Sequence, residues 1–168
     1  MNEREIPAAP GQQPVRYVVS ACLAGIHSRY NGERKAHEAV LDLIRRGVAL
    51  PVCPEQLGGL PTPRPPCEIL PGGPGCPARV LNRLGVDQSA EFRLGAEEGL
   101  RLARLFGATH AVLKAGSPSC GSGQVYDGTF SGRRVPGDGV FAAVLKAAGV
   151  RVMDESDLPL PPAEDARP

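Results

Sequence analysis

Three cysteines follow short apolar runs of the sequence. Cys22 comes after VRYVVSA, Cys53 after VALPV, and Cys120 lies in SPSCGSG, a few residues after AVLK. Each run predicts a short strand, and the carboxyl ends of parallel strands share the sheet edge where α/β proteins bind ligands. We therefore expect the three thiols to converge. Thiolates bind zinc, copper(I) and iron–sulfur centres, and three protein ligands leave one metal position open for a substrate or water.

The alternative for any one of these cysteines is a small buried side chain, because free cysteine is common in protein cores. Their repetition at three strand ends favours the metal centre. Cys67 and Cys76 lie in a segment rich in Pro and Gly, and we interpret both as bystander thiols, although either could supply a fourth ligand. The odd count of five cysteines and the absence of a CxxC pair argue against a disulfide framework, a zinc ribbon and a thioredoxin motif.

Four polar residues lie close to these cysteines in the sequence. Glu55 follows the second cysteine by two residues, and it is a candidate general acid or base. Ser117 precedes the third by three residues, where its hydroxyl either orients a substrate or satisfies the backbone of the turn. Lys114 and Arg64 are candidates for binding an anionic group of a substrate. The alternative for all three charged residues is the solvated surface.

Alternating strands and helices are expected to position these side chains. The apolar runs predict strands around residues 17–19, 48–53, 109–114 and 150–153. Apolar residues spaced by three or four predict helices at 36–46, 90–106 and 139–148, the last with Asp138 as N-cap and with Val140, Val144 and Ala147 on one face. Such alternation predicts a single three-layer α/β domain, with a small, mainly parallel sheet of about four strands and helices on both faces.

The remaining segments are expected to be irregular. Residues 58–77 contain so many Pro and Gly residues that we predict neither a helix nor a central strand there, but an ordered loop that walls the site. The catalytic domain is expected to span residues 15–153. Residues 1–14 read as a disordered N-terminal arm and residues 154–168 as a flexible tail, because both are polar and rich in Pro.

The charge and composition of the chain limit the kinds of molecule that it is expected to bind. The 168 residues carry 19 basic and 18 acidic side chains, and a net charge of +1 argues against a nucleic-acid or membrane surface. The chain shows no apolar run of bilayer length and no signal-peptide pattern, so we expect a cytoplasmic protein with a small-molecule partner. GxGxxG and GxxxxGK[ST] motifs are absent, which leaves the usual modes of nucleotide binding without support. Oligomeric state stays open.

Several blocks of the sequence together resemble the thiouracil desulfidase family: VSACLAG with SRYNG, PVCPEQLGGLPTPRPPCEI, LKAGSPSCGSGQVYDGTFSG and GDGVFAAVL. The resemblance implies a [4Fe–4S] cluster held by Cys22, Cys53 and Cys120, with the fourth iron free of protein ligands. It implies non-redox Lewis-acid catalysis at that iron. A thiolated nucleobase such as 2-thiouracil would be converted to uracil and hydrogen sulfide.

The same resemblance implies proton transfer by Glu55 and substrate contact by Ser117. The chain departs from the family at Cys67, where the motif PRPPxEI usually has a small apolar residue, and in the loop that contains Cys76. Two other functions stay open. One is an iron–sulfur-dependent sulfur transferase, and the other is a non-enzymatic iron–sulfur or zinc protein, for which Glu55 would be dispensable.

Overall fold

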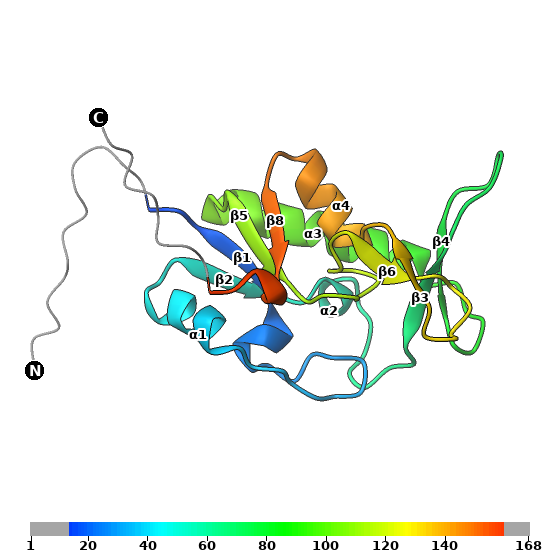
Figure 1. The fold of residues 1–168 in the computed structure, drawn as a ribbon, viewed down its shortest axis with the longest axis horizontal. Coiled ribbons are helices and arrows are strands. Elements are labelled where there is room, and N and C mark those ends of the chain that lie inside the picture. The colour runs from blue at the N-terminus through cyan, green and yellow to red at the C-terminus, as the bar shows by residue number, and fades with distance from the viewer. Residues whose placement is uncertain (1–13, 160–168) are drawn as a thin grey trace, which may run out of the picture.

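A four-stranded parallel sheet forms the middle layer of the computed structural model, which describes residues 14–159 (Figure 1). Its strands, in spatial order, are β2 (Ala49–Val52), β1 (Tyr17–Ser20), β5 (His110–Leu113) and β8 (Arg151–Asp154). All neighbouring pairs are parallel. The predicted parallel sheet of four strands is confirmed, and the carboxyl ends of its strands share one edge.

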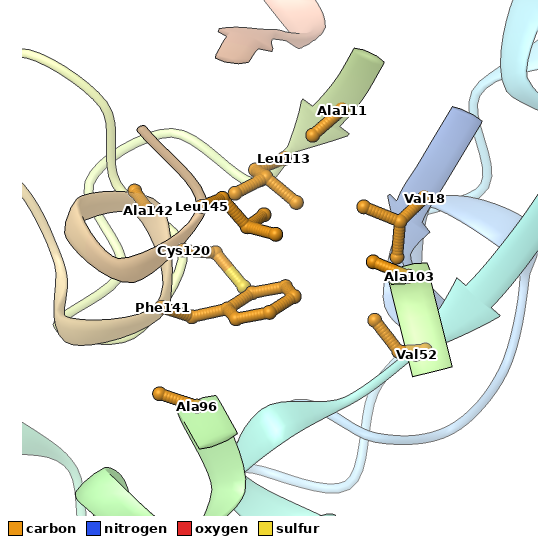
Figure 2. Close-up of a cluster of buried hydrophobic side chains, with 10 residues drawn as sticks. All are labelled: Val18, Val52, Ala96, Ala103, Ala111, Leu113, Cys120, Phe141, Ala142 and Leu145. Carbon is orange, nitrogen blue, oxygen red and sulfur yellow. The ribbon is translucent and has the colours of Figure 1, made fainter. Parts of the chain in front are cut away.

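Helices cover both faces of this sheet. The helix α1 (Glu38–Arg45) packs on one face, and α3 (Ser89–Phe106) and α4 (Val140–Ala147) pack on the other. Successive residues of a strand point to opposite faces, so Val18 joins the core beneath α3 and α4, while Val19 joins the core beneath α1. Figure 2 shows the first core, in which the Phe141 ring of α4 fills the space between the sheet and α3. The predicted three-layer arrangement is therefore confirmed.

The buried face of α4 differs from the predicted one. Sequence spacing placed Val140, Val144 and Ala147 toward the core, whereas the buried residues are Phe141, Ala142 and Leu145. The reason is the large Phe141 ring, which packs against α3 where Gly99 leaves room: a Cβ built on Gly99 would lie 2.6 Å from the ring. The largest side chain, rather than the spacing of valines, sets the rotation of the helix.

Asp138 is not the N-cap of α4, which corrects another prediction. Gly139 occupies that position, and a Cβ there would approach the Ser119 carbonyl oxygen to 2.4 Å. The Asp138 carboxylate instead accepts hydrogen bonds from the Gly123 amide at 2.8 Å and from Lys146 at 2.7 Å. The Asp138 carboxylate therefore binds groups outside the first turn of α4 and does not cap the helix.

Two antiparallel ribbons occupy segments between the helices. The first pairs β3 (Cys67–Leu70) with β4 (Arg79–Asn82), and the second pairs β6 (Gln124–Tyr126) with β7 (Arg134–Pro136). Strand β3 lies inside residues 58–77, which corrects the prediction of an irregular loop there. A two-stranded ribbon needs only one hydrogen-bonded neighbour for each strand, so prolines and glycines close to its strands are tolerated.

Short helical turns join the strands to the site. The 3-10 turn η1 (Ala21–Ala24) directly follows β1, and the one-turn helix α2 (Pro54–Leu57) follows β2 with Pro54 as its first residue. Strand β8 and the 3-10 turn η2 (Glu155–Asp157) carry regular structure past the predicted domain boundary at residue 153. Residues 1–13 of the predicted arm and 160–168 of the predicted tail lie outside the described residues. Between residues 14 and 159, no helix is long and apolar enough to cross a membrane.

Candidate functional site

A cavity of about 490 Å³ lies at the carboxyl edge of the parallel sheet. All of the candidate residues from the sequence line it: Cys22, Cys53, Glu55, Arg64, Lys114, Ser117 and Cys120. The strand order puts β2 on one side of β1 and β5 on the other, so the connections after β1 and β5 leave in opposite directions. This is the point of an open α/β sheet at which ligand sites form. Cys67 also lines the cavity, whereas Cys76 is exposed and does not.

The three strand-end cysteines lie close enough to influence one another. Burial, and then the neighbouring Cys53, raises the pKa of Cys22 to about 11. Burial also raises the pKa of Cys53 and that of Cys120, and the thiols of Cys53 and Cys22 add to the increase at Cys120. Cys120 belongs to the apolar core as well, with its sulfur beside the Phe141 ring (Figure 2). The predicted convergence of three thiols is thus present, although each thiol is also partly or wholly buried.

The chemistry of these thiols indicates which kind of metal centre they could hold. Within residues 14–159, no group of three or more His, Cys, Asp or Glu side chains is arranged to hold a single metal ion. In a [4Fe–4S] cluster each cysteine binds a different iron, so its thiolates stand farther apart than the ligands of one zinc ion. The positive charges of Lys114 and Arg29 lower the pKa of Cys22, but burial outweighs them and the pKa stays raised. Three cysteine thiols at one cavity are donors of the kind that iron–sulfur centres take.

The turn that carries Cys120 is organised by Ser117. Its Oγ accepts hydrogen bonds from the amides of Ser119 at 3.1 Å and Cys120 at 3.0 Å. The Gly121 amide donates to the Ser117 carbonyl at 2.8 Å, and a Cβ on Gly121 would lie only 2.7 Å from the same oxygen. Ser117 therefore satisfies the turn backbone, and its own hydroxyl proton is left to donate.

Glu55 is held by Arg64 in a buried ion pair. Arg64 Nε donates to Glu55 Oε2 at 2.7 Å, and the two side chains are only 4% and 13% exposed. The other guanidinium nitrogens donate to the carbonyls of Ser28 at 2.9 Å and Pro61 at 3.2 Å. The Ser28 carbonyl also accepts from the Cys53 thiol at 3.7 Å. Arg64 thus links the Glu55 carboxylate to the Ser28 carbonyl that the Cys53 thiol also contacts.

A second ion pair joins Lys114 to Glu155, a residue that sequence reasoning assigned to the flexible tail. Lys114 Nζ contacts Glu155 Oε1, and the Ala115 amide donates to Glu155 Oε2 at 2.6 Å. Asp154 pairs with Leu113 in the sheet, so the residues that follow these two strands lie side by side. Glu155 follows its strand directly, as Lys114 follows β5, and this shared position was the signal that could have identified it.

Close packing between α2 and α3 fixes the turn that bears Glu55. A Cβ on Gly95 of α3 would lie 1.8 Å from the Pro54 carbonyl oxygen, and a Cβ on Gly58 would lie 2.0 Å from the Glu91 carbonyl oxygen. Only glycine allows the two backbones to approach this closely. Cys53 is the N-cap of α2, so the same contact holds both Cys53 and Glu55 at the cavity.

Aromatic and guanidinium side chains on the cavity wall were not identified from the sequence. Each of three aromatic rings has an arginine over it, and all six residues line the cavity: Tyr30 with Arg29, Tyr126 with Arg134 and Phe130 with Arg83. The chain contains only seven aromatic residues, so three at one cavity is a concentration. Tyr126 and Phe130 lie in one segment and Tyr30 lies about a hundred residues earlier, so only the fold shows that the three rings share a cavity.

The fold and the cavity together define an α/β protein with a thiol-lined cavity at the carboxyl edge of a parallel sheet. Residues 17–157 match the family described as 2-thiouracil desulfurase, and the chain belongs to this family. It is 44% identical over 146 residues to YbbK of Bacillus subtilis (strain 168), described as uncharacterized, covering 84% of this chain and 96% of YbbK. It is also similar to a solved structure of TudS, a [4Fe-4S]-dependent thiouracil desulfidase. That match has 42% identity and a TM-score of 0.78, covering 87% of this chain and 94% of TudS.

Proposed function

We propose that this protein is a [4Fe–4S]-dependent desulfidase that removes sulfur from thiolated nucleobases such as 2-thiouracil. The convergence of Cys22, Cys53 and Cys120 on one cavity beside Glu55 carries the proposal. Membership of the 2-thiouracil desulfurase family and the similarity to TudS support it. A cytoplasmic location, where thiols stay reduced, belongs to the same proposal.

Cys22, Cys53 and Cys120 are the residues that would hold the cluster. When bound, a cluster with one iron free of protein ligands supplies a Lewis acid that polarises a thiocarbonyl without net electron transfer. The overall reaction is a hydrolysis, in which 2-thiouracil and water give uracil and hydrogen sulfide. No external oxidant or reductant is required. Lys114 and Arg29, whose charges partly oppose the rise in the pKa of Cys22, would offset the charge of a thiolate ligand at this end of the cavity.

Glu55 moves the proton in this proposal. The Arg64 guanidinium holds Oε2, which leaves Oε1 as the oxygen assigned to proton transfer. A carboxylate at this position accepts a proton from water as the oxygen adds to the carbon, and it returns the proton to the sulfur as the carbon–sulfur bond breaks. Ser117 orients the nucleobase substrate by donating its hydroxyl proton, because the Ser117 oxygen already accepts hydrogen bonds from two backbone amides.

Anaerobic reconstitution of the full chain, followed by incubation with 2-thiouracil, tests the proposal. Iron and acid-labile sulfide measure cluster content, and uracil and sulfide are expected in equal amounts. Glu55→Gln is expected to keep the cluster and to lower kcat by about 10²–10⁴-fold, the usual contribution of a general acid or base. Glu38→Gln, which changes an exposed carboxylate of α1, serves as the control.

The alternative functions give different results in the same experiment. A fully loaded protein that releases neither uracil nor sulfide contradicts the proposed desulfidase. Sulfide that leaves the protein only when an acceptor is supplied indicates a sulfur transferase. A Glu55→Gln variant with unchanged activity excludes the assigned proton-transfer role.

A further inference from the structure

Phe130 adopts a backbone conformation that bulky residues rarely occupy. Its φ is +55°, the only positive value found for a residue other than glycine within residues 14–159. For an aromatic residue the left-handed region costs free energy, and it persists only where surrounding contacts hold the chain. Such strain is concentrated at functional sites. The Phe130 ring lines the cavity and is only partly buried, so packing in a core does not account for the conformation.

Glu68 of β3 supplies the contacts that hold this conformation. Its carboxylate is buried, and Oε2 accepts hydrogen bonds from the backbone amides of Gly128 at 3.0 Å and Phe130 at 2.9 Å. Two amide donors on one buried carboxylate oxygen fix the loop on both sides of Thr129. A Cβ on Gly128 would lie 2.9 Å from the Ile69 carbonyl oxygen, so the loop lies directly against β3.

Asp127 stabilises the first part of the loop that joins β6 to β7, residues 127–133. Its carboxylate accepts from the Thr129 amide at 3.0 Å and from the Thr129 hydroxyl and Arg133 Nε at 2.6 Å each. The Arg83 guanidinium carbon lies 5.8 Å from the Phe130 ring centroid and covers one face of the ring. Phe130 and Arg83 both line the cavity. A rigid loop that presents a ring inside a cavity is the arrangement that stacks planar groups.

We propose that Phe130 is a substrate-binding residue that stacks on the plane of the thiolated base, and that Glu68 is the positioning residue that holds its ring in place. The inference rests on the proposed desulfidase function and adds the recognition of the base to it. The cysteines and Glu55 act on the thiocarbonyl group, which is common to many compounds. A stacking side chain selects compounds whose thiocarbonyl group is part of a flat, conjugated ring. Phe130 therefore sets the substrate class.

Substitutions at Phe130 test the stacking role in the cluster-loaded full chain. Phe130→Ala is expected to raise the KM for 2-thiouracil about tenfold, the scale of one base–aromatic stacking contact, with little change in kcat. Calorimetry should show the same loss in affinity for uracil, which lacks the sulfur atom and so measures contact with the ring alone. Phe130→Tyr should behave like the wild type, whereas Phe130→Leu keeps apolar bulk but should resemble Phe130→Ala.

Substitutions at Glu68 test the positioning role. Glu68→Ala removes the acceptor of both amides and should raise KM as Phe130→Ala does, while Glu68→Gln keeps an oxygen acceptor and should have a much smaller effect. The double variant with both alanine substitutions should be no worse than Phe130→Ala, because non-additivity shows that Glu68 acts through the ring. Phe106→Leu is the control: its ring also has a guanidinium over it, at 5.3 Å, but does not line the cavity.

The outcomes separate this inference from the proposed function. If the wild type releases sulfide from 2-thiouracil, and Phe130→Ala and Phe130→Leu leave both KM and uracil affinity unchanged, the stacking role is wrong and the desulfidase stands. If the wild type binds uracil but releases no sulfide, and the Phe130 variants weaken uracil binding about tenfold, the stacking role stands and the proposed reaction is wrong. A wild type that neither turns over 2-thiouracil nor binds uracil overturns both.

Discussion

Arg64 donates its Nε proton to Glu55 Oε2 across 2.7 Å, and both side chains are withdrawn from solvent. All three guanidinium nitrogens are engaged by acceptors within the chain. The sequence suggested Arg64 as a substrate-binding residue. The ion pair supports a different proposal, in which Arg64 fixes the carboxylate that moves the proton and the substrate meets Glu55.

Arg64→Ala is predicted to destabilise the fold by about 3–5 kcal/mol, because it leaves a buried carboxylate without its partner. Urea unfolding of the cluster-free chain measures the loss. Arg45→Ala is the matched control, since the Arg45–Glu38 pair has side chains 61% and 77% exposed and such pairs contribute at most about 1 kcal/mol. Equal losses in the two variants would contradict a structural role for the buried pair.

Gly95→Ala is predicted to destabilise the protein by about 3 kcal/mol and to lower activity, because the new Cβ would push α2 and Glu55 away from α3. The obstacle is a backbone oxygen, which cannot rotate aside as a side chain can. Gly73→Ala, where a Cβ meets nothing within 4 Å, should be close to neutral in the same unfolding measurement. A fully active and stable Gly95→Ala protein would show that the α2–α3 contact does not position the site.

Cys67→Ala is predicted to leave iron content, acid-labile sulfide and turnover unchanged. Burial, and then the charge of Glu55, raises the pKa of Cys67 to about 12, but the other cavity cysteines are not among the groups that shift it. Cys67 belongs to β3, outside the parallel sheet, and its thiol donates to the Pro65 carbonyl at 3.7 Å. Cys53→Ala should lose the cluster, and the exposed Cys76→Ala is the neutral control. A gain in activity on removing Cys67 would mean that its thiol occupies the open iron.

Asp127→Asn is predicted to reduce the acid sensitivity of the fold. Hydrogen bonds from the Thr129 hydroxyl and then from Arg133 lower the pKa of Asp127 to about 2. Because an unfolded Asp titrates near pH 3.9, this carboxylate adds stability that is fully present above about pH 4 and is lost as the pH falls toward 2. Urea midpoints measured from pH 5 to pH 2 should therefore decline less in Asp127→Asn than in the wild type. The control is Asp42→Asn, which changes an exposed carboxylate on α1, and its urea midpoint should decline as that of the wild type does.

The central sheet and the convergence of the thiols could be predicted from the sequence. Apolar runs and helical spacing are local signals, and they predicted the four central strands and the three long helices. In a parallel sheet the carboxyl ends share one edge, so the sequence could place Cys22, Cys53 and Cys120 together from the expected parallel pairing alone. The resemblance to the desulfidase family came from the same segments, and the family match confirmed it.

The groups that hold the candidate site residues in place became visible only in the folded structure. Arg64 reaches Glu55 from an adjoining loop, Glu155 reaches Lys114 from 41 residues away, and Glu68 holds Phe130 from 62 residues away. Such pairs leave no periodic signal, because their meeting depends on how separate elements pack. The strained Phe130 loop follows from the same cause: its conformation is imposed by a buried carboxylate on another strand, and local sequence preferences oppose it.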